Sequence, residues 1–294
     1  MNDSFSCALC RGRRCKPLFA IHDLRFWRCA DCGLVQMAPI PETEEAGDDY
    51  AGFDLTRYRE FVTMFRIPQY ERDVSFIRKY AESGRLLDIG CGTGEFLDVA
   101  ANNGFQAFGL EPSWKAYEIA RKSHPVARGE FKDMCFKENH FDVITLWSVL
   151  EHVPEPSDFL RRLHSILREK GLLALRLPDV RGLLPSLALW IYKISLGRIG
   201  SPLGILYQLD WHSKHYYGYD RGTLGRLLAK NGFEVVDSRS ENSFDYRSLD
   251  LRMDYLPIKR IARRIAKGAL GVILFLAKAL KKEDELVLIA RKTI

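Results

Sequence analysis

Residues 86–94 read Leu86-Leu87-Asp88-Ile89-Gly90-Cys91-Gly92-Thr93-Gly94, an apolar run followed by three alternating glycines. The run predicts a buried strand. The glycines predict a tight turn, because glycine adopts positive φ and lets a ligand approach the backbone. A helix is expected near Glu95, with its unpaired N–H groups and positive dipole end facing that ligand. A second apolar run, 105–110, ends in Glu111, whose carboxylate can accept both hydroxyls of a ribose. The sequence therefore predicts a nucleoside site.

The loop differs from two common phosphate-binding loops. A dinucleotide fingerprint requires a third glycine at position 95, where this chain has Glu95. A P-loop continues with Gly-Lys-Ser or Gly-Lys-Thr, and that sequence does not follow the glycines here. The expected ligand is therefore a nucleoside that carries no phosphates.

The glycine motif resembles that of the class I S-adenosylmethionine-dependent methyltransferases, in which a strand is followed by D-x-G-C-G-x-G. Residues 88–94 match this pattern at every position. The segment 129–133 (Gly-Glu-Phe-Lys-Asp), followed by Phe-Asp-Val-Ile-Thr-Leu-Trp-Ser-Val-Leu-Glu-His-Val at 141–153, is similar to the quinone and sugar O-methyltransferase branch, which reads F-D-x-V…LEHV. The similarity is strong over 81–180, moderate over 215–240 and weak over 283–294.

The resemblance implies S-adenosylmethionine as cofactor and assigns residues to it. Asp88 is expected to orient the methionine end, and Glu111 to bind the ribose. The other assigned positions are the loop glycines, the pair expected at the adenine and an aromatic residue after the fourth strand: Gly90, Gly92, Gly94, Glu130, Phe131 and Trp147. Glu130 departs from the family's usual Asp. A capping role for Asp88 and a core role for Trp147 are the alternatives.

Two histidines are the candidate catalytic bases. His152 follows the strand end nearest the sulfonium, and imidazole titrates near neutral pH. His215 resembles a substrate-site histidine of sugar methyltransferases. The quinone branch binds a metal on E-x-x-E-H, but the first position here is Ser148, so one ligand of a catalytic metal is missing. The alternative for each histidine is a structural hydrogen bond.

Strand-like and helix-like segments alternate from residue 85 onward. Gly104 and Gly232 each follow an asparagine and precede a phenylalanine, a pattern typical of a helix end before a new strand. Such alternation predicts an α/β fold with a doubly wound parallel sheet, whose ligands bind at the carboxyl ends of the strands. The resemblance further implies a Rossmann-like sheet with an antiparallel last strand near 285–291.

Four of the seven cysteines form two C-x-x-C pairs, Cys7 with Cys10 and Cys29 with Cys32, which bracket eighteen residues. This spacing resembles a zinc ribbon with a tetrahedral structural site. A segment this short would need the metal to fold. We therefore expect zinc at these four residues and a spare thiol at Cys15.

The predicted organisation follows from these motifs. Its parts are a zinc-ribbon-like segment (1–40), a linker with covering helices (41–82), the cofactor-binding core (83–180), an apolar insertion on the active-site rim (181–214), a core continuation (215–240), a basic amphipathic insertion (241–282) and the last core strand (283–294). Helical periodicity over 57–82 predicts the covering helices, with a break near Pro68.

Positive charge is concentrated in one segment. The chain has a net charge of +6, and residues 257–282 hold eight Lys or Arg and no acid. This concentration argues against a nucleic-acid footprint spread over the surface. Apolar residues at helical spacing in this segment and in 181–208 predict amphipathic helices on an anionic membrane surface. A substrate lid or a dimer face is the alternative.

The chain lacks the features of an exported or membrane-spanning protein. The first nine residues have no apolar signal core, and no uncharged apolar run reaches the roughly 18–20 residues of a spanning helix. Paired cysteines without a disulfide pattern favour a reducing compartment. The sequence predicts a cytoplasmic protein, with peripheral attachment to the inner face of the membrane.

Together these features predict O-methylation of a glycan, a lipid-linked sugar or a quinone-like acceptor. One alternative is an RNA methyltransferase whose ribbon binds RNA through Arg11, Arg13, Arg14 and Lys16. Aromatic stacking platforms for RNA cannot be located in the sequence. Another alternative is a non-catalytic scaffold that binds S-adenosylmethionine at a membrane. The sequence does not predict an oligomeric state.

Overall fold

The computed structural model describes residues 6–41, 61–210, 213–243, 246 and 260–293. Residues 42–60 of the predicted linker and covering helices (41–82) lie outside the described residues. Part of the predicted basic insertion, 247–259, lies outside them as well. Strand and helix alternate from residue 84, as the apolar pattern predicts.

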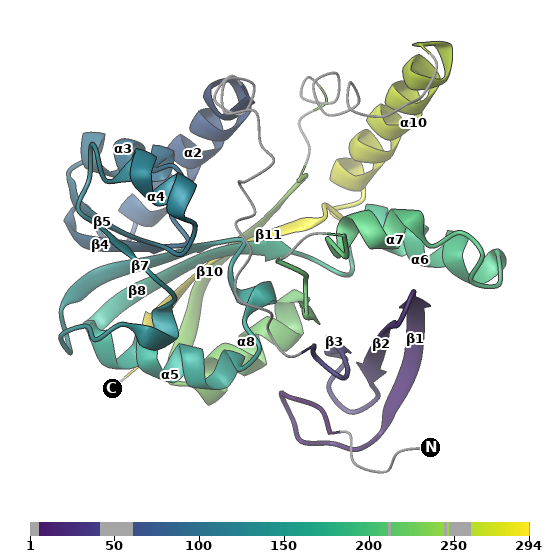
Figure 1. The fold of residues 1–294 in the computed structure, drawn as a ribbon, viewed down its shortest axis with the longest axis horizontal. Coiled ribbons are helices and arrows are strands. Elements are labelled where there is room, and N and C mark those ends of the chain that lie inside the picture. Colours follow the sequence, from purple (N-terminus) through teal and green to yellow (C-terminus); the bar gives the residue numbers. More distant parts are fainter. Residues whose placement is uncertain (1–5, 42–60, 211–212, 244–245, 247–259, 294) are drawn as a thin grey trace.

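Seven described strands form one mixed sheet (Figure 1). They are β4 (Gly84–Ile89), β5 (Phe105–Glu111), β6 (Val126–Arg128), β7 (Phe141–Trp147), β8 (Leu167–Pro178), β10 (Phe233–Glu241) and β11 (Glu285–Lys292). The order is β10-β11-β8-β7-β4-β5-β6, and β11 runs antiparallel to both of its neighbours. The predicted Rossmann-like fold with an antiparallel last strand is confirmed.

Helices cover both faces of this sheet (Figure 1). The helices α2 (Ile67–Arg78), α3 (Glu95–Asn102) and α4 (Trp114–Ala120) lie on one face, and α5 (Pro156–Ile166) and α8 (Arg221–Lys230) lie on the other. Each face has its own apolar core. Near Pro68 the structure has a change of helix type, because the π-helix η1 (Val62–Arg66) continues directly into α2.

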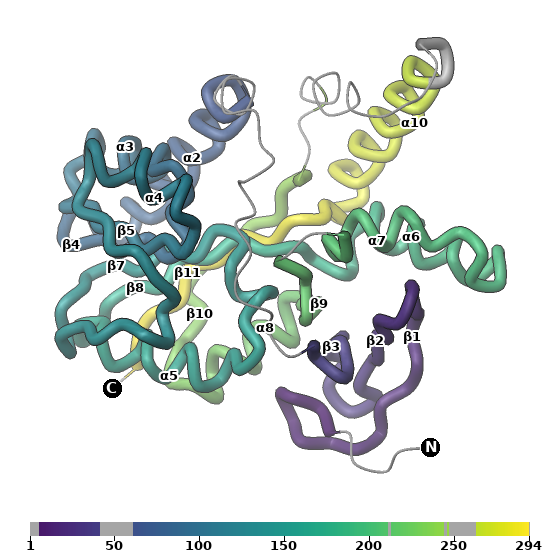
Figure 2. The backbone as a smooth tube through the Cα atoms, in the orientation of Figure 1, coloured from purple at the N-terminus to yellow at the C-terminus, as the bar shows by residue number. Residues whose placement is uncertain are grey.

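The N-terminal segment forms a second sheet that includes a strand of the core. Its order is β1 (Cys15–Ile21), β2 (Leu24–Cys29), β3 (Val35–Met37) and β9 (Tyr217–Gly218). Figure 2 shows the N-terminal strands beside β9, which comes from far along the chain. Apolar side chains of β1 to β3 belong to the same buried cluster as those of α5 and α8. The N-terminal segment is therefore packed onto the core, not held apart by a linker.

The two insertions meet at the carboxyl edge of the large sheet. The helices α6 (Leu183–Ile194) and α7 (Ser201–Leu206) follow β8, and α10 (Arg260–Ala279) precedes the antiparallel β11. Leu183 N donates to Lys282 O at 2.7 Å, and α6 contacts α10. The structure thus places both insertions at the edge where the resemblance expected the active-site rim. No described helix combines the length and apolar character needed to cross a bilayer.

Candidate active site

The glycine loop after β4 has the conformation that its sequence predicts. Gly90, Gly92 and Gly94 have φ of 74°, 55° and 93°, where other residues are strained. A Cβ on Gly90 would lie 2.9 Å from Cγ2 of Val149, so no side chain fits there. Helix α3 begins at Glu95, as expected. The loop therefore presents backbone atoms and a helix start at the carboxyl end of β4.

Glu111 joins the end of β5 to this loop. Its side chain is buried; Oε2 accepts from Gly92 N at 2.8 Å, and Oε1 accepts from Ser113 N at 2.9 Å. An ionised carboxylate has about four acceptor positions and can bond to more than one partner at a time. The structure therefore fits the predicted ribose contact of Glu111, and that contact stays a prediction.

Asp88 connects two central strands. It is 1% exposed, and Oδ1 accepts from Thr145 Oγ1 of β7 at 2.6 Å. Burial raises the pKa of Asp88 to about 8 despite this hydrogen bond. A positive cofactor group nearby would favour the charged form. The expected contact with the methionine end of the cofactor stays a prediction.

The predicted adenine pair lies next to Glu111. Gly129 N donates to Glu111 O at 3.2 Å, which brings the following residues to the end of β5. Glu130 pairs with Lys132 at 2.8 Å. Phe131 is buried and stacks on Phe136 with the ring centroids 5.7 Å apart. The structure thus gives Phe131 a core role, and its contact with adenine stays a prediction.

Trp147 ends β7 beside α3. Its ring lies edge to face with Phe96, with the centroids 5.0 Å apart. Its indole Nε1 is buried and has no hydrogen-bond partner among the described residues. Buried N–H groups normally have an acceptor, so this one is suited to a bound ligand.

A polar cluster lies directly after β7. Glu151 and His152 belong to the short helix η3 (Leu150–His152), and His215 precedes β9. One ligand-type atom from each of the three lies within 4.8 Å of those of the other two. The bond from Tyr216 N to Glu151 O, 2.8 Å long, holds the two segments together. Val149, against the glycine loop, lies only two residues before Glu151. The cluster therefore adjoins the predicted cofactor site.

Burial sets the protonation of Glu151 and His215. Neither carboxylate oxygen of Glu151 has a hydrogen-bond partner in the described part of the chain, and burial raises its pKa to about 8. Burial, followed by the neighbouring His152, lowers the pKa of His215 well below 6.5. At neutral pH the cluster therefore holds a largely protonated carboxyl group and a neutral His215.

The tautomer of His152 follows from one hydrogen bond. Its Nδ1 lies 3.0 Å from Lys214 O, and a carbonyl only accepts, so Nδ1 carries the proton. Nε2 of the neutral ring then carries the lone pair. Both predicted histidines are thus brought together, with ring centroids 4.7 Å apart.

Glu151 belongs to this cluster but was not among the site residues predicted from the sequence. Its only signal was its place in Ser148-x-x-Glu151-His152. The imidazole of His215 joins Glu151 and His152, because the chain returns to η3 just before β9. Sequence spacing alone does not reveal that return.

Comparison with known proteins shows the family and the fold of this chain. The family described as a methyltransferase domain matches residues 58–238. The chain belongs to this methyltransferase family. Its fold is that of S-adenosylmethionine-dependent methyltransferases.

The methyltransferase shares 31% identity over 96 residues with a ubiquinone biosynthesis O-methyltransferase of Aeromonas salmonicida, covering 30% of this chain and 40% of that protein. The corresponding enzyme of Yersinia enterocolitica is 30% identical over 96 residues, and the match covers 30% of this chain and 39% of that enzyme. The chain thus spans about two fifths of the curated relatives it matches.

Solved structures resemble the methyltransferase over most of its length. An S-adenosylmethionine-dependent methyltransferase from Archaeoglobus fulgidus matches with a TM-score of 0.53 and 19% identity, covering 80% of this chain and 99% of that one. The 1,6-didemethyltoxoflavin-N1-methyltransferase of Burkholderia thailandensis, solved with S-adenosylhomocysteine, matches with a TM-score of 0.51 and 14% identity, covering 95% of this chain and 100% of that one. These similarities concern the fold alone.

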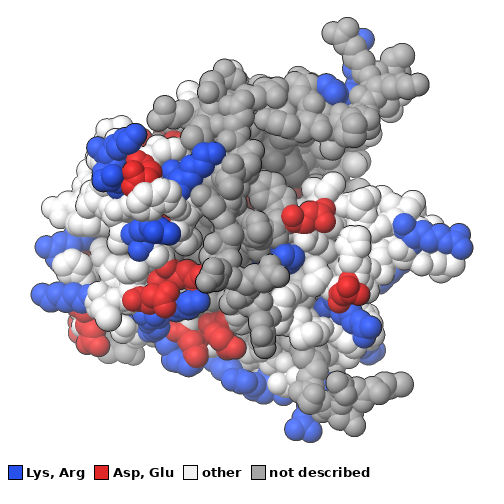
Figure 3. All heavy atoms as spheres, in the orientation of Figure 1, with Lys and Arg blue, Asp and Glu red and all other residues white. Residues whose placement is uncertain are grey.

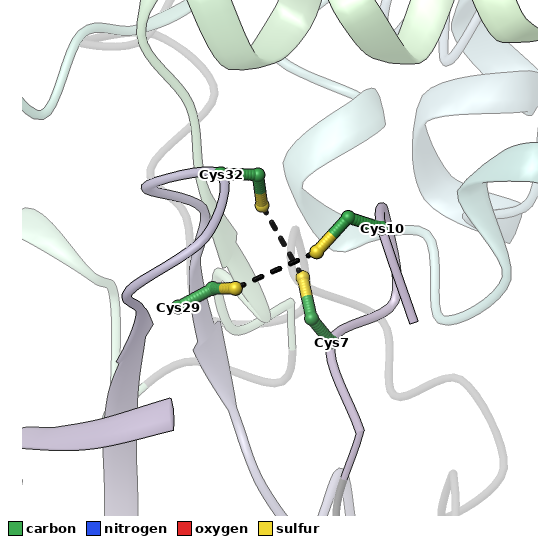
Figure 4. A group of neighbouring side chains, drawn as sticks. All are labelled: Cys7, Cys10, Cys29 and Cys32. Atoms are coloured by element: carbon green, nitrogen blue, oxygen red, sulfur yellow. Dashed lines mark hydrogen bonds between the residues drawn. The ribbon is translucent and has the colours of Figure 1, made fainter. Parts of the chain in front are cut away.

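The four paired cysteines of the methyltransferase converge in space (Figure 4). Sγ of Cys7 lies 3.4 Å from Sγ of Cys32, and Sγ of Cys10 lies 3.6 Å from Sγ of Cys29. All four sulfur atoms lie within 4.8 Å of one another, whereas Cys15 is outside the group. The donor set and the spacing fit one tetrahedral Zn²⁺ ion.

The cysteine cluster is anchored to helix α8. Arg226 donates to Cys32 O, and Lys230 Nζ donates to Leu9 O at 2.9 Å. Burial acts to raise the pKa of Cys29, but hydrogen bonds from backbone N–H groups to its sulfur have the larger combined effect. The pKa of Cys29 is therefore lowered to about 7. Burial raises the pKa of Cys7. A metal ion would deprotonate all four thiols.

Proposed function

We propose that this methyltransferase transfers the methyl group of S-adenosylmethionine to a hydroxyl oxygen of a glycan, a lipid-linked sugar or a quinone-like acceptor at a membrane surface. The cluster of Glu151, His152 and His215 beside the glycine loop is the observation that carries the proposal. It brings together two imidazoles, one of them the neutral His215, beside the loop where the sulfonium is expected.

The chemistry is an in-line displacement at the methyl carbon. The acceptor oxygen forms a bond to carbon while the carbon–sulfur bond breaks, and both electrons of that bond stay on sulfur. A histidine of the cluster accepts the hydroxyl proton. Its positive charge replaces that of the sulfonium, so the site's total charge is conserved. Binding both reactants in line supplies most of the remaining acceleration.

As an alternative to a histidine base, the same three side chains suit a divalent cation. Buried Glu151 and His215 carry polar atoms with no partner among the described residues, and His152 completes a set of one carboxylate and two imidazoles. Such an ion, bound by these residues, would polarise the acceptor oxygen. His215 would then supply the ligand that Ser148 lacks.

We also propose zinc at Cys7, Cys10, Cys29 and Cys32. The convergence of the four sulfur atoms supports a structural site with no open position. Exposed basic side chains beside the first knuckle, Arg11, Arg13 and Arg14, keep RNA as a competing substrate to be tested.

Two exposed surfaces support the membrane part of the proposal. Trp190, Ile194 and Leu196 at the end of α6 are 60%, 62% and 84% exposed. On α10 and just beyond it, Ile265, Phe275 and Leu280 are 68%, 71% and 59% exposed. Exposed Lys and Arg side chains accompany both groups, as the outer end of the α6–α7 segment shows in Figure 3. Apolar and basic side chains in one surface suit an anionic bilayer.

The test uses methyl-labelled S-adenosylmethionine and a whole extract of the host. After incubation with the purified protein, label is separated into organic-soluble lipid, small aqueous metabolites and RNA. We expect label in lipid or glycan material, and a loss of that label with the His215→Gln variant. The exposed His22→Gln variant is the matched control.

Two results would contradict the proposal. Label in RNA would make the N-terminal segment a substrate-binding module. Binding of the cofactor, measured by calorimetry, without label in any fraction would support the scaffold alternative.

A further inference from the structure

The N-terminal segment shares a β-ladder with the chain that carries His215. Residue Val35 of β3 pairs with Gly218 of β9, and Gln36 pairs with Tyr217. One residue further on, Met37 N donates to Tyr216 O at 2.7 Å. The backbone immediately after His215 is therefore the outer strand of the cysteine-containing sheet.

Gln36 connects this ladder to the first cysteine knuckle. Its side chain is 3% exposed; Oε1 accepts from Ala8 N at 2.9 Å, and Nε2 donates to Ser6 O at 3.3 Å. Ser6 and Ala8 flank Cys7, one of the four clustered cysteines. Gln36 thus bonds to the first cysteine knuckle through its side chain and pairs with Tyr217 through its backbone.

His215 has a second support from the same sheet. Its backbone N donates to Tyr207 O at 3.0 Å. The ring of Tyr207 lies against Phe19 of β1 and Phe26 of β2, with centroid distances of 5.1 and 4.7 Å. Tyr207 and Tyr216, which both lie beside His215, are therefore contacted by strands of the N-terminal sheet.

The cofactor half of the site is held differently. The glycine loop bonds to Leu110 and Glu111 at the end of β5, within the large sheet. Its hydrophobic neighbours belong mainly to the core between the sheet and α2 to α4.

We propose that zinc bound by Cys7, Cys10, Cys29 and Cys32 positions His215, so that zinc occupancy controls the acceptor half of the active site without controlling cofactor binding. The strands β1 to β3 pack on the core, but the two knuckles that hold the cysteines lie outside regular strands or at a strand end, so the metal is expected to order them. Loss of zinc would release β3, then β9, and the imidazole of His215 would leave Glu151 and His152. His215 is thereby a residue whose position depends on a metal that it does not touch.

The role of His215 at the acceptor half of the active site rests on the proposed function. The test of its dependence on zinc requires no methyl acceptor. Hydrogen exchange of the full chain is followed by mass spectrometry with zinc bound and after chelation under reducing conditions, with the zinc content measured in parallel. We expect exchange in peptides covering 213–220 to accelerate at least ~10-fold, while peptides covering 84–111 change little. Affinity for S-adenosylhomocysteine should stay within about twofold.

A variant separates the connection from the metal. Gln36→Ala leaves every cysteine in place, so it should retain zinc and still accelerate exchange in 213–220. The imidazole resonances of His215, assigned with the His215→Gln variant, should shift both in Gln36→Ala and after chelation. Cys135→Ser, at an exposed cysteine outside the cluster, is the control and should change neither readout.

Three outcomes would overturn the inference. One is a protein that binds no zinc at the four cysteines. Another is unchanged exchange in 213–220 after zinc removal. The third is equal acceleration in 84–111, because zinc would then stabilise the whole fold. A failure to find any acceptor would affect the proposed function alone, because these readouts do not involve methyl transfer.

Discussion

The imidazole rings of His152 and His215 lie 4.7 Å apart, centroid to centroid, although His152 follows β7 and His215 precedes β9. His152 is placed by the turn after β7, and His215 by the strand pairing of β9 with the N-terminal sheet. The proposed acceptor side of this methyltransferase therefore depends on two separate parts of the fold.

Replacing either histidine should slow methyl transfer without weakening cofactor binding. His152→Gln and His215→Gln are each expected to reduce kcat by about 10²–10⁴-fold, the usual contribution of a positioned base. Steady-state assays on the acceptor found by labelling, with calorimetry for the cofactor, measure both effects. His22→Gln should behave as the unaltered protein, and a His215→Gln variant with full kcat would remove this residue from the mechanism.

Glu151 should make stability depend on pH in the metal-free and cofactor-free protein. Its folded-state pKa of about 8 lies above the ordinary 4.5, so the folded state binds more protons than the unfolded state between these values. This contribution is complete below pH 4.5 and is lost as the pH rises to about 8. Urea unfolding at pH 6 and pH 8 should show a smaller loss for Glu151→Gln than for the unaltered chain. Equal losses in both proteins would count against a protonated Glu151.

Glu111 should be a main determinant of cofactor affinity. Glu111→Ala removes the predicted acceptor of the ribose hydroxyls and also leaves Gly92 N without this acceptor, so Kd for S-adenosylhomocysteine should rise by about 10–100-fold. Isothermal titration calorimetry measures the change. Glu118→Ala on α4, which pairs with Arg121 at the surface, is the control. An unchanged Kd for Glu111→Ala would place the ribose elsewhere.

Membrane attachment should depend on the exposed apolar side chains near the end of α10. Phe275→Ser combined with Leu280→Ser should lower binding to anionic vesicles by at least ~10-fold, because each large apolar side chain contributes about 1.5–3 kcal/mol when fully buried. Co-sedimentation with phosphatidylserine-containing vesicles at low salt is the measurement. Met64→Ser, another exposed apolar position, is the control. A protein that stays in the supernatant before any substitution contradicts the membrane proposal.

Arg176 should be essential for folding. It is 1% exposed in the middle of the sheet and pairs with Asp73 of α2 at 2.6 Å and with Glu285 of β11. Arg176→Met leaves Glu285 buried without its ion-pair partner and leaves Asp73 paired with Arg239 alone, and it should cost about 3–5 kcal/mol of unfolding free energy. Urea denaturation measures this cost. Arg121→Met at the exposed pair on α4 is the control and should leave the urea midpoint nearly unchanged, because surface ion pairs contribute little to stability.

The cofactor half of the site could be predicted because its residues are close in sequence. A strand, a glycine turn and a helix follow one another without interruption, and Glu111 ends the next strand. Asparagine and glycine at 103–104 and 231–232 end helices as expected, because left-handed conformations are open to glycine.

The acceptor half could not be predicted to the same extent. The motif around His152 contained Ser148 in place of a carboxylate, and nothing local to His215 indicated that it approaches Glu151. The buried Arg176 also gave no sequence signal, because its partners come from three separate elements.

The sequence by itself determined the α/β fold, the cofactor loop and the two cysteine pairs, since each of these depends on residues a few positions apart. Two features are visible only in the folded structure: β9 is the fourth strand of the N-terminal sheet, and Glu151, His152 and His215 form one cluster. The physical reason is that strand pairing and burial join distant segments through backbone hydrogen bonds, which any residue can make and which therefore leave no pattern of side chains to read.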